Sequence, residues 1–397
     1  MPNTFISADR IHNGQQWLPQ GSVLEIAPTG HIAGIHAAGL IPETQIQQYT
    51  GILCPGFVNA HTHLELSHLK GEIPEATGLV AFVKAVVKTR AQFTQDMKQE
   101  ALLNALSAMK ANGIAAVGDI ANTTDMLPFR ESSGLNVHTF VEVLGLDPRQ
   151  AGKAFRSAKN IYDQYQAQHS DNFQLRQSIV PHAPYSVSDK LFDLINEQAA
   201  GQLISIHNQE TQAEAQWFKD KTGAFPGFFS QMGFATDLFS PSGKSSLQTY
   251  LPWLSKPAQI LLVHNTCIEE DDIAFAGLRH PEIFYCLCPM ANWYIERAVP
   301  PVEMLMAAGA GICLGTDSLS SNHELNILCE IRQIRKHFPE IPFETLLRWA
   351  TANGAKALNL SDYAGHLTKG KAPGIIHLID EHTTGANVLF PAAKPIR

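Results

Sequence analysis

Charged side chains are scarce in this sequence of 397 residues. Asp, Glu, Lys and Arg make up 17% of the chain, and the formal net charge is −8 at pH 7 with histidine neutral. The sequence has no basic stripe of the kind that binds a phosphate backbone, so we expect no nucleic-acid partner.

Long apolar runs are also lacking. No stretch approaches the ~18 apolar residues that a membrane-spanning helix needs. The first residues, MPNTFISADRIHNG, do not show the basic region followed by an apolar region that marks a secretory signal. We therefore expect a cytoplasmic protein without a membrane partner.

Cysteine is too sparse to build a disulfide scaffold in a chain of this length. The six cysteines mostly lie within apolar runs, where buried free thiols are the expected state. Cys286 and Cys288 form the one tight pair in the sequence. Two thiolates alone do not complete a zinc site, so the cysteines do not point to a metal centre.

Apolar residues are plentiful, at 45% of the chain, and they occur in short runs that alternate with long amphipathic stretches. This alternation is typical of parallel strands connected by helices. The number of runs fits a (β/α)₈ barrel, and an open doubly wound sheet is the alternative architecture. The runs are Phe57–Ala60, Ala115–Ile120, Val137–Val143, Leu175–Val180, Leu203–Ile206, Gln259–Val263, Ile283–Leu287 and Gly311–Leu314.

The amphipathic stretches predict the intervening helices. Leu79–Ala111 is one long stretch that ends at Asn112-Gly113, a helix-stop signal. Ser186–Asp189 resembles a capping box at the start of the next helix. Asn326–His337 and Phe343–Leu358 predict the last two helices.

Both ends of the chain differ from this central part in their pattern of apolar and turn residues. The first segment predicts short strands at Thr4–Ile6, Ser22–Ile26 and Ile32–Ile35, separated by hairpin-type turns. The residues from His366 onward again show a pattern typical of strands and turns. The two ends could therefore form one small β-domain.

Histidines and carboxylates recur where the predicted strands end. His61 and His63 follow the first run, and because residues i and i+2 of a strand point the same way, both imidazoles can face the barrel interior. His207, His264 and Asp317 follow the fifth, sixth and eighth runs. Hydrogen-bonded core histidines are the structural alternative for His61 and His63 alone. The full set favours a metal site, because buried ionisable groups are costly unless they are paired or bound to a metal.

The donor types suit a divalent cation. Three neutral imidazoles and one carboxylate are typical of Zn²⁺ with a position open to water, and Fe²⁺ and Mn²⁺ are alternatives. Glu210 lies three residues after His207 and is better used as a proton shuttle than as a ligand. His182 follows the fourth run just before a predicted helix, so we expect it to contact substrate; a structural role is the alternative.

Four motifs carry a family resemblance: PGFVNAHTHLELS (55–67), IHNQE (206–210), VHN (263–265) and LGTDS (314–318). They resemble the amidohydrolase superfamily in its aminohydrolase branch, which includes cytosine, guanine and S-adenosylhomocysteine deaminases and triazine chlorohydrolases. The resemblance implies a metal-dependent hydrolase on a distorted (β/α)₈ barrel. It also implies a composite β-sandwich, giving segments 1–54 and 366–397 to the sandwich and 55–365 to the barrel.

The same resemblance implies residue roles. It makes Glu210 the proton shuttle, His264 the side chain that orients the attacking hydroxide, and Asp317 a base as well as a ligand. No lysine ends the fourth run, which disfavours the two-metal branch with a carboxylated lysine and favours a single ion. The implied metal ligands are His61, His63, His207 and Asp317.

Two further segments, HAPYSVS (182–188) and GTDSLSSNHELNIL (315–328), are similar to deaminases of adenine-type nucleosides. The best candidate substrate is 6-amino-6-deoxyfutalosine of menaquinone synthesis. The alternatives are S-adenosylhomocysteine or methylthioadenosine, guanine, and another azine or chloro-azine. A non-catalytic binding protein is disfavoured because no implied ligand is missing. The implied substrate contacts are His182, Ser318, Asn322 and Trp293.

The sequence does not identify the part of the substrate that lies away from the reacting ring. A carboxylate there would pair with an arginine guanidinium. The resemblance implies a homodimer that acts on a small molecule. The arginines considered for the carboxylate are Arg130, Arg149, Arg156, Arg176 and Arg297.

Overall fold

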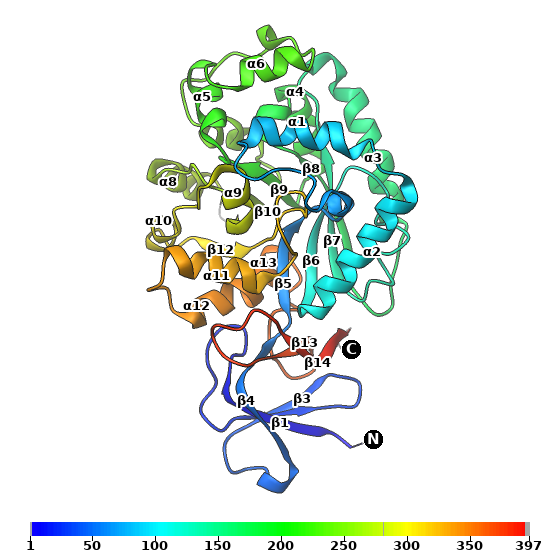
Figure 1. The fold of residues 1–397 in the computed structure, drawn as a ribbon, viewed down its shortest axis with the longest axis vertical. Helices are drawn as coiled ribbons and strands as arrows, with labels where there is room; N and C mark the ends of the chain where they lie inside the picture. Colours follow the sequence, from blue (N-terminus) through cyan, green and yellow to red (C-terminus); the bar gives the residue numbers. More distant parts are fainter. Residues whose placement is uncertain (1, 281, 394–397) are drawn as a thin grey trace.

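A computed structural model describes residues 2–280 and 282–393. Figure 1 shows an α/β body with a smaller layer of strands at one end, where strands from both ends of the chain, β1 and β13, flank β4. No helix among the described residues is both long and apolar enough to cross a membrane. The described cysteines are free, and five of the six are buried, as predicted.

The α/β body contains two four-stranded parallel sheets, ordered β5-β6-β7-β8 and β12-β11-β10-β9. Each strand covers one of the predicted apolar runs. The strands are β5 (Phe57–Thr62), β6 (Ile114–Ala121), β7 (Asn136–Val143), β8 (Leu175–Pro181), β9 (Leu203–Asn208), β10 (Gln259–His264), β11 (Ile283–Leu287) and β12 (Gly311–Leu314). They are almost wholly buried because helices cover them, as expected for parallel strands.

Backbone hydrogen bonds join the two sheets at the carboxyl ends of their edge strands. The amide of His207 donates to the carbonyl of His182 at 3.0 Å, beside β8 and β9. The amide of Thr316 donates to the carbonyl of His61 at 3.0 Å, beside β12 and β5. Within the described residues the strand ladder is continuous in each sheet and not around a closed barrel, so the fold is an α/β fold of TIM-barrel-like form.

One predicted helix is two helices in the structure. The stretch 79–111 divides into α1 (Leu79–Arg90) and α2 (Gln95–Ala111). The Thr94 side chain accepts a hydrogen bond from the amide of Met97 and caps a new helix, which explains the break. The predicted stop is confirmed, because Gly113 takes a left-handed φ of 79° directly after the C-cap residue Asn112.

The helices at 189–198, 327–337 and from Phe343 fall on the other predicted amphipathic stretches. Ser188 caps α4 (Asp189–Gln198) by accepting from the amide of Leu191. The stretch from Phe343 bends through a π-helical turn at Trp349–Asn353. The remaining helices are α3 (Ala151–Gln166), α5 (Gln212–Asp220), α6 (Phe225–Gln231), α7 (Ser246–Tyr250), α8 (Glu270–Arg279), α9 (Pro289–Glu296), α10 (Val302–Ala307), α11 (Ile327–His337), α12 (Phe343–Arg348) and α13 (Gly354–Ala357).

The terminal segments share one six-stranded sheet with the order β14-β13-β4-β1-β2-β3. β4 pairs parallel to β1 and antiparallel to β13, so it ties the two ends together before the chain enters β5. That these segments form a separate β-sandwich domain stays a prediction. The strands are β1 (Thr4–Ile11), β2 (Val23–Ile26), β3 (Ile32–His36), β4 (Ile46–Pro55), β13 (Ala372–Leu378) and β14 (Asn387–Ala393).

Candidate metal centre and active site

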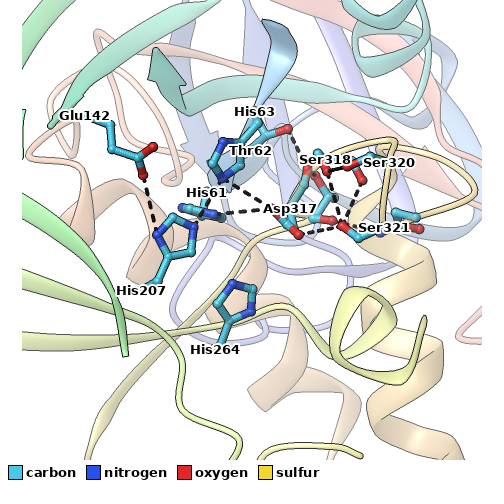
Figure 2. Close-up of polar contacts among 12 residues, drawn as sticks. His61, Thr62, His63, Glu142, His207, His264, Asp317, Ser318, Ser320 and Ser321 are labelled. Atoms are coloured by element: carbon cyan, nitrogen blue, oxygen red, sulfur yellow. Dashed lines mark hydrogen bonds and ion pairs between the residues drawn. The ribbon is translucent and has the colours of Figure 1, made fainter. Parts of the chain in front are cut away.

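The predicted ligands converge at the carboxyl ends of the strands, where TIM-barrel enzymes carry their chemistry. Figure 2 shows His61 from β5, His63 directly after β5, His207 from β9 and Asp317 from the turn after β12 around one point. Gly315 allows β12 to approach β5 this closely, because a Cβ on Gly315 would lie 2.9 Å from Cβ of His61.

The spacing of the donor atoms matches a metal coordination shell. Nε2 of His63 lies 3.3 Å from Nε2 of His207, and Oδ1 of Asp317 lies 3.4 Å from Nε2 of His63 and 3.6 Å from Nε2 of His61. A tetrahedral shell with bonds of ~2.0–2.1 Å has edges of ~3.3–3.4 Å. Neither ring nitrogen of His61 has a hydrogen-bond partner among the described residues. These residues therefore fit a divalent cation.

Burial keeps the imidazoles neutral. It lowers the pKa of His61, His207 and His264 to about 4, and the pKa of His63 well below its usual value. Burial alone would raise the pKa of Asp317, but its contacts with the surrounding histidines hold that pKa well below its usual range. Neutral imidazoles and an ionised carboxylate are the protonation states that bind a metal.

Hydrogen bonds behind the cluster fix which histidine nitrogens face inward. Nδ1 of His207 lies 2.7 Å from the carbonyl oxygen of His182, to which it donates, so the lone pair of His207 is on Nε2. The side-chain amide of Asn292 donates to Nδ1 of His264 at 3.2 Å, which leaves the proton of His264 on Nε2. Glu142 lies 3.5 Å from Nδ1 of His207 (Figure 2).

Asp317 sits on a tightly held turn. Its backbone is left-handed, with φ of 55°, and its carbonyl accepts a hydrogen bond from the Thr62 hydroxyl at 2.8 Å. Asn59 of β5 donates to the hydroxyl and accepts from the amide of Thr316, the preceding residue. The Ser321 hydroxyl donates to Oδ2 of Asp317, so Oδ1 is the oxygen that faces the histidines.

Glu210 lies close to His264 and lines the same cavity as Asp317. Its Oε1 is 3.6 Å from Nε2 of His264. Burial raises the pKa of Glu210 well above its usual value, and the nearby carboxylates of Asp317, Glu214 and Glu296 add to the effect. The raised pKa favours the protonated form of Glu210, which is the form that can donate a proton.

The turn that carries Glu210 is held by a second buried carboxylate. Oε1 of Glu214 accepts from the amide of Gln209 at 3.0 Å, and Oε2 accepts from the amide of Glu210 at 3.2 Å. Gln209 has a left-handed φ of 46°, a conformation that needs such support. Its side chain donates to Asp272 of α8 at 2.6 Å, which anchors the turn to the adjoining helix.

A cavity of about 160 Å³ opens over the cluster. His182 and Ser318 line it together with Glu210 and Asp317, and their contact with a substrate stays a prediction. Nδ1 of His182 lies 2.6 Å from the Ser186 hydroxyl. His182, Glu142 and His207 also have donor atoms close enough together to bind a metal ion.

The structure does not bring Asn322 and Trp293 to the described wall of this cavity. The side-chain amide of Asn322 donates to the carbonyl of Thr316 and to Glu330, both at 2.9 Å, so it braces the turn before Asp317. The ring of Trp293 lies 5.0 Å from that of His337 on α11, with the two ring planes tilted by 50°. Their assignment as substrate contacts stays a prediction.

Several residues of the site were not singled out in the sequence. Glu142 lies inside the apolar run of β7. A single carboxylate within an apolar run was the only feature of the sequence that could have identified it. Asn292, Glu214 and Arg90 act on the site or line its cavity only through the tertiary arrangement. In sequence they are ordinary helix residues.

Comparisons with known proteins agree with this arrangement. The amidohydrolase family model matches residues 52–390. An adenosine deaminase of Helicobacter pylori is 28% identical over 321 residues, which cover 78% of this chain and 75% of that protein. An aminodeoxyfutalosine deaminase of Nitratiruptor is 26% identical over 329 residues, covering 81% of this chain and 77% of that protein.

The fold is also similar to solved structures. A crystal structure of the aminofutalosine deaminase of Helicobacter pylori, in complex with methylthio-coformycin, superposes with a TM-score of 0.80 at 22% identity, covering 94% of this chain and 91% of that one. The family match spans most of the sequence and includes the strand ends that carry the histidines and Asp317. The chain therefore belongs to the amidohydrolase family and is a hydrolase that acts on carbon–nitrogen bonds, the class that includes the cyclic amidine deaminases.

Proposed function

We propose that this chain is a metal-dependent deaminase that converts an amino-substituted purine-type nucleoside and water into the oxo product and ammonia. The observation that carries the proposal is that one cavity is lined by Glu210, a carboxyl with a raised pKa, by Asp317, a carboxyl with a lowered pKa, and by neutral histidines. A site of this kind supplies both an acid and a base to the same substrate atom.

His61, His63, His207 and Asp317 would hold one divalent ion, with Zn²⁺ as the expected metal and Fe²⁺ or Mn²⁺ as the alternatives. The spacing of these donors supports this assignment. The chemistry that such an ion supplies is activation of water, whose pKa falls from 15.7 to about 7. His182 supports His207 through its backbone carbonyl.

The residues of this chain then share the proton transfers. His264 orients the attacking water with its Nε2–H, because Asn292 holds its other nitrogen as an acceptor. Asp317 accepts the proton that the water gives up. Glu210 donates its proton to the ring nitrogen beside the amino-bearing carbon, which makes that carbon open to attack. The water oxygen bonds to that carbon, and the proton that Asp317 accepted passes to the amine. The C–N bond breaks and ammonia leaves, while the remaining proton of the new hydroxyl returns to Glu210 and the oxo product forms.

The proposed substrate is 6-amino-6-deoxyfutalosine, which would place the enzyme in menaquinone biosynthesis. The relatives named as an aminodeoxyfutalosine deaminase and an adenosine deaminase support a purine-type nucleoside. A panel of ammonia-release assays with aminodeoxyfutalosine, S-adenosylhomocysteine, methylthioadenosine, adenosine, guanine and cytosine tests this choice. A higher kcat/KM for any other compound would replace the proposed substrate.

Glu210→Gln tests the mechanism itself. The amide keeps the size of the side chain but cannot transfer a proton, so kcat should fall by about 10²–10⁴ with metal content and Tm unchanged. Glu303→Gln, at an exposed glutamate of α10, is the matched control. Turnover close to that of the unchanged protein would refute the proton-shuttle role, and loss of metal would make Glu210 a ligand.

The remaining architectural and cellular assignments are proposals of the same kind. We propose that the eight parallel strands act as a distorted (β/α)₈ barrel over 55–365, with a composite β-sandwich from 1–54 and 366–397. We also propose a cytoplasmic homodimer that needs neither nucleic acid nor membrane. Light scattering coupled to size-exclusion chromatography measures the assembly, and a monomeric mass would overturn the dimer.

A further inference from the structure

Two buried asparagines join the turn that carries Glu210 to the turn that follows His264. Asn208 is the last residue of β9, and Asn265 directly follows His264 at the end of β10. The side-chain amide of Asn208 donates to Oδ1 of Asn265 at 3.0 Å, and the backbone amide of Asn265 donates to the carbonyl of Asn208 at 2.9 Å. The two strand ends are therefore tied together through both their backbones and their side chains.

The turn after β10 has a strained backbone. His264 and Asn265 are consecutive non-glycine residues in the left-handed region, with φ of 75° and 60°. Such a conformation persists only where the surroundings enforce it, and asparagine tolerates it better than most residues. The side-chain amide of Asn265 donates to the carbonyl of Leu262 at 2.9 Å, so it bonds back to the strand that it leaves. Asn265 therefore helps to hold the backbone conformation that sets the direction of the His264 side chain.

Asn208 supports the neighbouring turn. Its Oδ1 accepts from the Tyr250 hydroxyl at 2.8 Å, and its side-chain amide also donates to Oε1 of Gln209 at 3.3 Å. Gln209 is left-handed as well and directly precedes Glu210. The carbonyl of Gln209 accepts from the amide of Cys267, in the turn after β10, at 2.8 Å. The two turns thus form one hydrogen-bonded unit.

Completion of a buried polar network is the alternative reason for these contacts. Buried amides need hydrogen-bond partners, but an apolar pair of similar volume would fill the same space without that need. The network lies where two polar side chains of the active site meet. Oε1 of Glu210 is 3.6 Å from Nε2 of His264, and both residues line the cavity over the metal ligands. A shift of either turn would change that distance.

Resting on the proposed function, we propose that Asn265, braced by Asn208, is a positioning residue for His264 and Glu210. Its side chain holds the left-handed turn after β10 against the turn that carries Glu210. The donor that orients the attacking water and the acid that protonates the ring nitrogen then meet one substrate from fixed positions. Misplacement of such groups by about 1 Å is enough to slow a reaction severely.

Asn265→Ala removes both side-chain hydrogen bonds and keeps the Cβ that opposes a left-handed φ. We expect kcat to fall about 10- to 100-fold in folded, metal-loaded protein, with KM changed less than about 3-fold. Asn265→Gly also removes the bonds but accepts the left-handed φ without strain, so it should recover part of the lost kcat. Asn160→Ala, at an exposed asparagine of α3, is the matched control and should leave kcat unchanged.

A double-mutant cycle separates positioning from a general loss of stability. If Asn265 acts by placing Glu210 and His264, its replacement should cost much less kcat once Glu210→Gln has already removed the acid. A residue with a structural role alone would change kcat by the same factor in both backgrounds. Equal factors in the two backgrounds, or an unchanged kcat in Asn265→Ala, would overturn the inference.

A crystal structure of Asn265→Ala gives a readout that needs no turnover. The distance of 3.6 Å between Nε2 of His264 and Oε1 of Glu210 should increase by about 1 Å. An unchanged distance overturns the inference. A longer distance in an enzyme that releases ammonia from no nucleoside supports it and refutes the proposed function alone.

Tyr250→Phe tests the same network if Asn265→Ala does not fold. It removes only the hydrogen bond to Oδ1 of Asn208, so kcat should fall about 2- to 10-fold. An unchanged kcat in this variant would also count against the positioning role.

Discussion

The side-chain amide of Asn292 lies 3.2 Å from Nδ1 of His264 and donates a hydrogen bond to it. Because an amide nitrogen can only donate, the imidazole must carry its proton on Nε2, the atom 3.6 Å from Glu210. Asn292 on α9 thereby sets the tautomer of a histidine at the end of β10. This link is what lets His264 donate toward the cavity.

Asn292→Asp should disturb that tautomer. An ionised carboxylate at this position accepts a hydrogen bond, so the proton of His264 moves to Nδ1 and the cavity loses a donor. We expect kcat to fall about 10- to 100-fold, as for other residues that orient a metal-site histidine. Steady-state kinetics with metal analysis checks it. Unchanged kcat in a folded, metal-loaded variant would exclude the orienting role.

Glu214→Gln should misplace Glu210. The glutamine can accept from one of the two amides at Gln209 and Glu210, but its NH₂ group opposes the other. We expect kcat to fall about 10-fold or more with KM and metal content little changed, as for other supporting contacts. Glu197→Gln, at an exposed glutamate of α4, is the control. A lower Tm without a change in kcat would reduce Glu214 to a structural residue.

His182→Asn separates a substrate contact from a ligand. The substitution keeps the backbone carbonyl that accepts from Nδ1 of His207 and removes the imidazole from the cavity wall. Metal content should therefore persist while kcat/KM falls about 10-fold or more. His182 could also bind a metal ion together with Glu142 and His207. Loss of the metal in the variant would therefore identify His182 as a ligand.

Asp119→Asn should stabilise the protein in a pH-dependent way. Asp119 at the end of β6 accepts from the amide of Leu64, and its Oδ2 has no partner among the described residues. Burial raises its pKa to about 8, above the ~3.9 of an unfolded chain. The stability that its protonated form contributes is therefore fully present below pH ~4 and is lost as the pH rises through 8.

Asparagine does not ionise, so the variant should not lose stability as the pH rises. The Tm advantage of Asp119→Asn should be near zero at pH 4 and reach about 1 °C by pH 9 for each ~1 kcal/mol recovered. Asp171→Asn, at an exposed loop residue, is the control and should show no such trend. A Tm difference that does not depend on pH would contradict the raised pKa.

The strands and the metal-donor residues could be predicted from the sequence, but the residues that hold those donors in place could not. His61 and His63 could be found because a strand of period 2 places both on one face directly after an apolar run. The break between α1 and α2 was missed because the apolar spacing continues across it and only the cap at Thr94 marks the new helix. Arg90 looks in sequence like any cation at a helix end, and only the packing of α1 brings it to the cavity.

The metal content of the purified protein tests the central claim most directly. Elemental analysis of protein prepared without chelators should give about one divalent ion per chain, and a variant with His61→Asn and Asp317→Asn should give close to none. The two donors lie 3.6 Å apart and belong to the same cluster in this account. A ratio near two, or an ion retained by the double variant, would contradict it.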